Sequence, residues 1–239
     1  MRVAVLGAGA WGTTIAALAA ASAPTRLWAL EPEVVQSIRE HGENSTYLAG
    51  HPLPASLHPT NDLAEAVEGA DLVIVAVPAR HLRAVMGLAG PSIGSGPLVL
   101  SLTKGIEPGT GRRMTEVLRE VLTNQEPNAI GVLSGPNLAH EVMAGHPSAT
   151  CVAFPDVTYA ESVQQLLMSD RLRVYTSPDV IGCEIGGAVK NVVAIAAGVA
   201  DGLGYGMNTK AALITRGLAE LSRLVIAVPT ILFLSLIHI

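Results

Sequence analysis

The sequence predicts an α/β fold in which a doubly wound, mostly parallel sheet is followed by the start of an all-helical domain. Short apolar runs alternate with helical segments through residue 179, and such alternation is typical of a parallel sheet covered by helices. From residue 180 onward, the segments 180–200 and 208–224 have helical texture with no strand between them. We therefore expect one domain at 1–179, an incomplete helical domain at 180–224 and a separate tail at 225–239.

Individual elements follow from where the apolar runs begin and stop. DLVIVAV at 71–77 is the clearest buried strand, and Pro78 ends it. The expected strands span 2–6, 26–29, 71–77, 97–102, 129–133, 149–153 and 172–175. The expected helices span 13–21, 31–38, 63–67, 80–88, 110–122, a short helix from 137, 159–167, 180–200 and 208–224. The segment 44–60 is rich in proline, histidine and glycine, so we expect a loop there.

Composition argues against several classes of function. The formal net charge is −5 and no basic run exists, so we expect no nucleic-acid binding. The 7 histidines form no HxH or HExxH pattern, and Cys151 and Cys183 lack metal-ligand spacing. We therefore expect no metal site and two buried free thiols. Because no signal peptide precedes the first strand, the cytoplasm is the expected compartment.

The tail at 225–239 reads VIAVPTILFLSLIHI and carries no charge and no periodicity. It is shorter than the roughly twenty apolar residues that a membrane helix needs, and Pro229 interrupts it. We therefore expect no membrane span here. We interpret the tail as foreign sequence joined to a truncated chain.

Three glycines open the chain's first helix with the spacing Gly7-x-Gly9-x-x-Gly12. Gly7 permits a tight turn, Gly9 lets the backbone approach a pyrophosphate, and Gly12 lets helix and strand pack closely. The spacing alone also fits a turn without a ligand. Here it lies between a strand and a helix within a complete βαβ unit, which favours a Rossmann-like dinucleotide site.

The end of the second strand bears on the choice between NAD and NADP. Glu31 lies about twenty residues beyond the glycine turn, where a carboxylate accepts a hydrogen bond from the ribose 2′-hydroxyl and repels a 2′-phosphate. Leu30 precedes it, so no basic residue stands beside the carboxylate. Stabilisation of the next helix N-terminus by Glu31 is an open alternative.

Two other strand ends carry polar groups. Lys104 follows the strand at 97–102, at the edge where open α/β sheets bind ligands. Its ammonium group is suited to a phosphate or to polarising a carbonyl. Gly135 and Asn137 follow the strand at 129–133 and are suited to holding a substrate oxygen or the nicotinamide carboxamide. Ordinary turn chemistry is the alternative for both segments.

Lys190 is the most informative single residue, because it lies inside the apolar, small-residue helix GGAVKNVVA. Burial lowers the pKa of a lysine and prepares its amine for proton transfer. Asn191 follows it and is suited to orienting the same substrate oxygen. A lysine whose ammonium reaches solvent along the helix is the alternative.

Taken together, the motifs resemble the NAD(P)-dependent sn-glycerol-3-phosphate dehydrogenases. The resembling segments, in the family's order, are GAGAWGT (7–13), NSTYLAG (44–50), LTKGIE (102–107), SGPNLAHEV (134–142), GGAVKNVVAIAAG (186–198) and NTKAALITRGLAELSRL (208–224). The resemblance implies interconversion of sn-glycerol 3-phosphate and dihydroxyacetone phosphate with NAD or NADP, which supplies glycerophospholipid synthesis.

The resemblance also implies roles for single residues. Lys190 matches the proton acceptor, and Lys104 matches a lysine shared between cofactor and substrate. Gly135 and Asn137 match substrate-contacting positions. Further matches to cofactor contacts are Ala10, Trp11 and Ala139. Leu30 falls where the family often has a basic residue for the 2′-phosphate.

The length of the family's members also bears on what activity is expected of this chain. The family continues for about a hundred more residues, a domain-sized piece that carries the arginine for the substrate phosphate. We therefore expect weak cofactor binding and little turnover from this chain, and a homodimer is left open.

A 6-phosphogluconate or 3-hydroxy-acid dehydrogenase is one alternative function, and a non-catalytic dinucleotide-binding protein is another.

Overall fold

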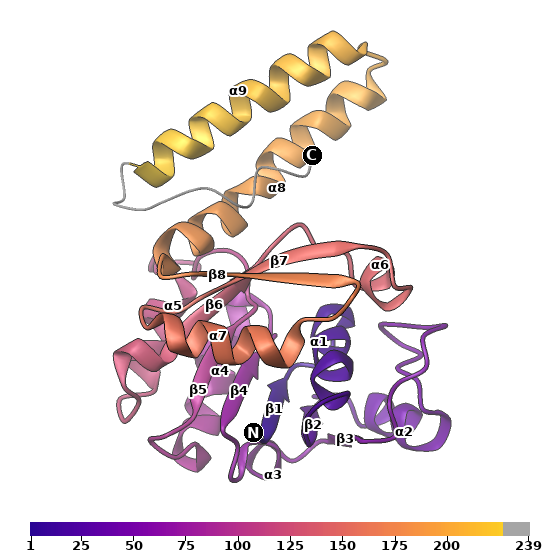
Figure 1. Ribbon diagram of the computed structural model, residues 1–239, viewed down its shortest axis with the longest axis vertical. Coiled ribbons are helices and arrows are strands. Elements are labelled where there is room, and N and C mark those ends of the chain that lie inside the picture. The colour runs from indigo at the N-terminus through magenta and orange to yellow at the C-terminus, as the bar shows by residue number, and fades with distance from the viewer. Residues whose placement is uncertain (227–239) are drawn as a thin grey trace.

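The structure is a computed structural model that describes residues 1–226 (Figure 1). The predicted tail at 225–239 therefore lies outside the described residues, apart from the end of the last helix. The strands are β1 Val3–Leu6, β2 Thr25–Trp28, β3 Leu57–Thr60, β4 Leu72–Val75, β5 Leu98–Ser101, β6 Ile130–Ser134, β7 Ser148–Ala153 and β8 Leu172–Ser177. The helices are α1 Ala10–Ala20, α2 Pro32–His41, α3 Leu63–Val67, α4 Ala79–Ala89, α5 Met114–Val121, α6 Ala139–Met143, α7 Val157–Leu167, α8 Val180–Gly202 and α9 Met207–Ile226.

The strands form one sheet in the order β3-β2-β1-β4-β5-β6-β7-β8. Strands β1 to β6 are parallel, β7 is antiparallel to β6, and β8 is parallel to β7. The order of strands reverses between β1 and β4. At the centre of β1, Val5 pairs with Leu27 of β2 on one side and with Ile74 of β4 on the other. The predicted doubly wound, mostly parallel sheet is confirmed, and its reversal point is where such sheets bind ligands.

Helices cover both faces of the sheet (Figure 1). One face packs against α1, α2 and α7, and the other against α3, α4 and α5. The central strands are buried on both sides, which explains their continuous apolar sequences. Fully buried side chains on the helices include Ile15, Val34, Val163, Leu82 and Leu118.

A hairpin of two long helices, α8 and α9, rises from the sheet domain (Figure 1). Val180 starts α8 and packs against Val132 of β6 and Ala153 of β7. Farther along, α8 leaves the sheet, and Ile195 is 68% exposed. By length and composition, α8 is the one helix in the described residues that is able to cross a membrane, a test that core helices of soluble proteins also pass. The predicted entry into a helical region after the sheet is confirmed.

Two sequence predictions were wrong in detail. The expected loop at 44–60 contains strand β3, which pairs with β2. Its sequence LHPT has no apolar run, but Pro59 is tolerated because β3 is the edge strand. The expected helix at 110–122 begins only at Met114, because Gly111 has φ +70° and Ile106 bridges to Arg113.

Candidate active site

The glycine turn between β1 and α1 is built as its spacing suggests. Gly7 has φ +110°, and a Cβ there would lie 2.8 Å from the Ala76 carbonyl oxygen. A Cβ on Gly12 would lie 1.9 Å from the Gly7 carbonyl oxygen, so only glycine fits at this crossing of helix and turn. Gly9 has no neighbour within 4 Å of such a Cβ and leaves open space over the turn.

The start of α1 presents free N–H groups toward that open space. Gly9 is the N-cap, and the first intrahelical bond runs from the Thr13 N–H to the Gly9 carbonyl. The N–H groups of Ala10, Trp11 and Gly12 precede that bond and have no partner within the helix. No acidic side chain lies in the first turn. The helix dipole and these donors suit a pyrophosphate.

Asn44 is bonded to the glycine turn, although nothing in its local sequence predicts a role for it. Its side chain is fully buried, and Nδ2 donates to the Ala8 carbonyl and to Thr13 Oγ1, both at 2.8 Å. Its Oδ1 accepts from the Tyr47 N–H at 3.1 Å. One amide therefore ties the segment after α2 to the backbone of the glycine turn.

Glu31 and Leu30 lie at the end of β2, as expected for the ribose-binding position. Leu30 is 71% exposed. Glu31 is the N-cap of α2, but its side chain makes no capping hydrogen bond. Instead it accepts from the Tyr47 hydroxyl at 2.9 Å, and that bond raises the pKa of Tyr47. The carboxylate is thus held at the rim of the dinucleotide site.

Lys104 follows β5, and its Nζ donates to the Gly135 carbonyl after β6 at 3.1 Å. The amine also lies near that of Lys190 of α8, so that each affects the pKa of the other. Burial is the main cause that lowers the pKa of Lys104 to about 8, and the neighbouring charge of Lys190 adds to it. The segments that follow β5 and β6 therefore meet α8 at the carboxyl-terminal edge of the sheet.

Lys190 is half-buried rather than directed fully to solvent. Desolvation by burial is the main cause that lowers its pKa, and the neighbouring Lys104 amine partly offsets that shift. The helix comes close because Gly187 has no side chain: a Cβ there would lie 2.4 Å from Ser134 Oγ and 3.9 Å from Lys104 Cγ. Small residues on α8 thus bring the Lys190 amine to the strand ends.

The remaining predicted residues surround the lysine pair to different degrees. Asn137 Nδ2 donates to the Ala149 carbonyl at 2.8 Å, while its buried Oδ1 has no hydrogen-bond partner among the described residues. Gly135 is buried against that amide. Asn191 is exposed on α8, and Ala139 begins α6. The buried Asn137 oxygen is therefore an acceptor without a partner among the described residues, next to Gly135.

Comparison with known proteins decides the family. The family model described as the NAD-dependent glycerol-3-phosphate dehydrogenase N-terminus matches residues 2–160, and the corresponding C-terminus model matches residues 179–237. The chain belongs to the NAD-dependent glycerol-3-phosphate dehydrogenase family.

Relatives agree with this assignment. A glycerol-3-phosphate dehydrogenase [NAD(P)+] from Thermobifida fusca is 50% identical over 95% of this chain and 68% of its own length. Those from Sphingopyxis alaskensis and Bacillus pumilus are 47% and 46% identical, and this chain spans 67% and 65% of their lengths. The crystal structure of glycerol-3-phosphate dehydrogenase from Coxiella burnetii has a TM-score of 0.88 and 37% identity, and covers 96% of this chain and 70% of its own. The chain therefore spans about two thirds of these dehydrogenases.

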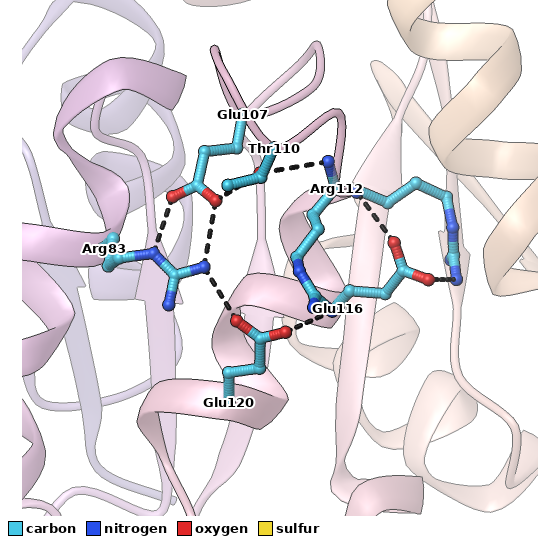
Figure 2. Close-up of polar contacts among 7 residues, drawn as sticks. Arg83, Glu107, Thr110, Arg112, Glu116 and Glu120 are labelled. Carbon is cyan, nitrogen blue, oxygen red and sulfur yellow. Dashed lines mark hydrogen bonds and ion pairs between the residues drawn. The ribbon is translucent and has the colours of Figure 1, made fainter.

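An ion-pair network fixes the loop that follows Lys104 (Figure 2). The Arg83 guanidinium donates to both oxygens of Glu107, at 2.7 and 2.9 Å, and to Glu120 at 2.8 Å. The Thr110 hydroxyl donates to Glu107 at 2.6 Å, and Arg112 pairs with Glu120. Hydrogen bonds from Arg83 and Thr110 lower the pKa of Glu107 to about 2. The network supports the dehydrogenase's lysine-bearing loop from outside the site.

A second buried carboxylate joins α8 to α5. Glu184 is 6% exposed and accepts from the Thr115 N–H at 2.8 Å, the Thr115 hydroxyl at 2.6 Å and Arg113 at 2.8 Å. Glu184 was not among the residues predicted for the site, although a charged residue in the apolar run VIGCEIGG carries the same signal as Lys190. Glu184 therefore sets where α8 begins its path toward the strand ends.

Proposed function

We propose that the protein binds NAD(P)(H) over the glycine turn and interconverts sn-glycerol 3-phosphate and dihydroxyacetone phosphate. The observation that carries the proposal is the meeting of Lys104 and Lys190 at the carboxyl ends of the strands, beside the sheet's reversal point. Relatives nearly half identical to this chain are named for the same reaction. The reduced product serves as the glycerol phosphate backbone for phospholipids.

The residues present fit a dinucleotide. Gly7, Gly9 and Gly12 keep side chains away from the turn, and the N–H groups at the start of α1 lie where the pyrophosphate would bind. When bound, the nicotinamide supplies the hydride acceptor or donor. The chain's own part is proton transfer and positioning. The C2 hydroxyl of glycerol 3-phosphate must lose its proton as C2 loses hydride, so a neutral amine is needed within hydrogen-bond reach. Lys190 Nζ holds that proton.

Lys104 and Lys190 have different tasks in this proposal, and the repulsion between their charges decides which of the two amines is neutral. Two ammonium groups repel each other, so the pair loses one proton more readily than a free lysine does. Without a ligand, Lys104 is the amine whose pKa is lowered to about 8. A substrate phosphate beside Lys104 would keep a proton there and leave Lys190 as the neutral partner. Substrate binding thereby prepares the base.

Polar groups after β6 orient the substrate in this scheme. The free Oδ1 of Asn137 accepts a hydrogen bond from a substrate hydroxyl or from the carboxamide of nicotinamide. Gly135 has no side chain, so Asn137 Oδ1 packs directly against its backbone, and the Gly135 carbonyl holds Lys104 in place. Asn191 lies next to Lys190 on α8 and gives a second amide on the solvent side. Ala139, Ala10 and Trp11 complete the expected cofactor contacts.

Among the two dinucleotides, we propose a preference for NAD(H). The Glu31 carboxylate at the end of β2 accepts from a 2′-hydroxyl and repels a 2′-phosphate, and Leu30 supplies no cation to offset that repulsion. NADH should therefore bind more tightly than NADPH. In a fluorescence titration, Leu30→Arg should narrow the difference, and tighter NADPH binding by the unmodified chain would contradict the preference.

The function is tested by mixing the protein with NADH and dihydroxyacetone phosphate and following nicotinamide absorbance. We expect weak NADH binding and slow oxidation that depends on dihydroxyacetone phosphate. Lys190→Ala should lower the rate by about a hundredfold while leaving the Kd for NADH nearly unchanged. An absence of NADH binding, or an equal rate for the variant, would reject the proposal.

A non-catalytic dinucleotide-binding protein is the second candidate, because the glycine turn alone requires no catalysis. A half-buried amine on α8 beside Lys104 has no task in such a protein, which favours the enzyme.

The homodimer and the cytoplasmic location are also proposals. Exposed apolar side chains on α8, such as Val192 and Ile195, support association, and two free thiols suit a reducing compartment.

A further inference from the structure

The two cysteines lie outside the machinery described above, yet they face each other. Cys151 is on β7 and Cys183 is on the second turn of α8, and their Sγ atoms are 3.8 Å apart. Both are free thiols, and both are half-buried rather than sealed in the core. The pair therefore joins the sheet domain to the helix that carries Lys190.

We propose that Cys151 and Cys183 are a redox-active dithiol, which a peroxide converts into an intrachain disulfide that ties α8 to β7. A disulfide bond is about 2.05 Å long, so the sulfur atoms must approach by roughly 1.8 Å. Rotation of the two side chains supplies part of that movement, and a small movement of α8 supplies the rest. No change of fold is needed.

The position of the pair gives the bond a consequence for the site. Cys151 is opposite Ser134 in the β6–β7 ladder, and Ser134 Oγ is the atom that a Cβ on Gly187 would meet at 2.4 Å. Cys183, Gly187 and Lys190 follow at i, i+4 and i+7, and so share one face of α8. The disulfide would lie one helical turn from the tight Gly187 contact and two turns from the Lys190 amine.

The two thiols are suited to different steps of the oxidation. The hydrogen bond with Cys183 is the main cause that lowers the pKa of Cys151, whereas the same bond and burial raise the pKa of Cys183. The Cys151 thiolate attacks a peroxide oxygen, so that an S–O bond forms, the O–O bond breaks and hydroxide leaves. The Cys183 sulfur then attacks Cys151, so that the S–S bond forms and the S–O bond breaks. Two thiols lose two electrons and two protons in total, and hydrogen peroxide is reduced to two waters.

The bond should change how α8 sits on the sheet. The helix cannot move straight toward β7, because Ser134 already touches it at Gly187. Drawing in Cys183 therefore pivots the helix about that contact and shifts Lys190 relative to Lys104. This consequence rests on the proposed function, and we expect turnover to fall about tenfold or more with little change in the Kd for NADH.

The experiment exposes the reduced chain to hydrogen peroxide in native buffer and maps its peptides by mass spectrometry without reductant. We expect loss of both free thiols, a linked peptide pair joining Cys151 to Cys183, and recovery of the thiols with dithiothreitol. Cys183→Ser should leave a sulfenic acid on Cys151, and Cys151→Ser should leave Cys183 largely unreacted. Circular dichroism checks that both variants fold.

Several outcomes would overturn the inference. These are thiols that stay reduced, cross-links only between separate chains, or independent sulfinic acids without the linked pair. The thiol readout needs no turnover, so it fails or succeeds apart from the proposed function. Where NADH oxidation is measured, a rate that drops on oxidation and recovers on reduction supports the pivot. An unchanged rate in the fully linked chain would overturn it.

Discussion

Replacing Gly12 by alanine perturbs the crossing of α1 and the glycine turn at its tightest point. The added Cβ would lie 1.9 Å from the Gly7 carbonyl oxygen, whereas ordinary contacts begin at 3.4 Å. The two groups must separate by about 1.5 Å, and the contacting atom is backbone that cannot rotate away. A second contact, 2.9 Å to the Ala76 Cβ, blocks movement on that side.

The magnitude follows from two opposing effects. Overpacking of this kind costs typically about 1–3 kcal/mol, and a clash with backbone belongs at the upper end. Alanine in a helix interior returns roughly 1 kcal/mol relative to glycine. We therefore expect Gly12→Ala to lower the free energy of unfolding by about 2 kcal/mol, which lowers Tm by about 4–8 °C for a chain of this size.

A matched control is available in the same sheet domain. Gly87 lies inside α4, is exposed, and has nothing within 4 Å of an added Cβ. Gly87→Ala should therefore stabilise the protein by up to about 1 kcal/mol. Thermal melts and urea unfolding of both variants measure the difference. If Gly12→Ala is as stable as the original chain, or if both variants shift alike, the argument from close packing is refuted.

Four further predictions concern the site and its supports. Asn44→Ala removes three hydrogen bonds, two of them buried, and leaves the Tyr47 N–H without its acceptor, so unfolding free energy should fall by about 1–3 kcal/mol and the Kd for NADH should rise, as fluorescence titration would show. Glu184→Ala leaves the Thr115 N–H without its acceptor and removes one of the two carboxylates that pair with Arg113, so unfolding free energy should fall by about 2–3 kcal/mol, measured by urea unfolding. Because the pKa of Glu107 is lowered to about 2 from 4.5, its stabilisation is present above pH 4.5 and is lost as the pH falls toward 2; Glu107→Gln should flatten that acid limb of the Tm profile. Since the pKa of Lys104 is about 8, calorimetry should show phosphate-bearing substrate binding less tightly as the pH rises above 8, and Lys104→Met should remove most of that dependence.

Most of the sheet is predictable because its strands are buried on both faces and therefore read as unbroken apolar runs. VAVL in β1 and LVIV in β4 are examples. Strand β3 is not predictable in that way, since LHPT owes its conformation to pairing with β2 at the sheet edge. Local sequence contains no sign of a partner that lies elsewhere in the chain.

In the candidate site, too, some features are predictable from the local sequence and others arise only from the folded structure. Glycines and lysines at strand ends are visible because each is unusual for its local element: Gly12 at a helix start and Lys190 in an apolar helix. The contact between Lys190 and Lys104 is a property of the folded sheet, and no spacing in the sequence announces it. Asn44 was missed for the same reason, because its partner Thr13 lies 31 residues away. Glu184 stands out in its apolar helix as Lys190 does, and only its partner Thr115, 69 residues away, is hidden from the sequence.

The most direct test of the central claim is a crystal structure of the protein with NAD and glycerol 3-phosphate bound. We predict the pyrophosphate on the N–H groups of residues 10–12 and the Lys190 Nζ within about 3 Å of the C2 hydroxyl oxygen. A dinucleotide bound elsewhere, or a Lys190 amine directed into bulk water away from the space over Gly9, would contradict the account.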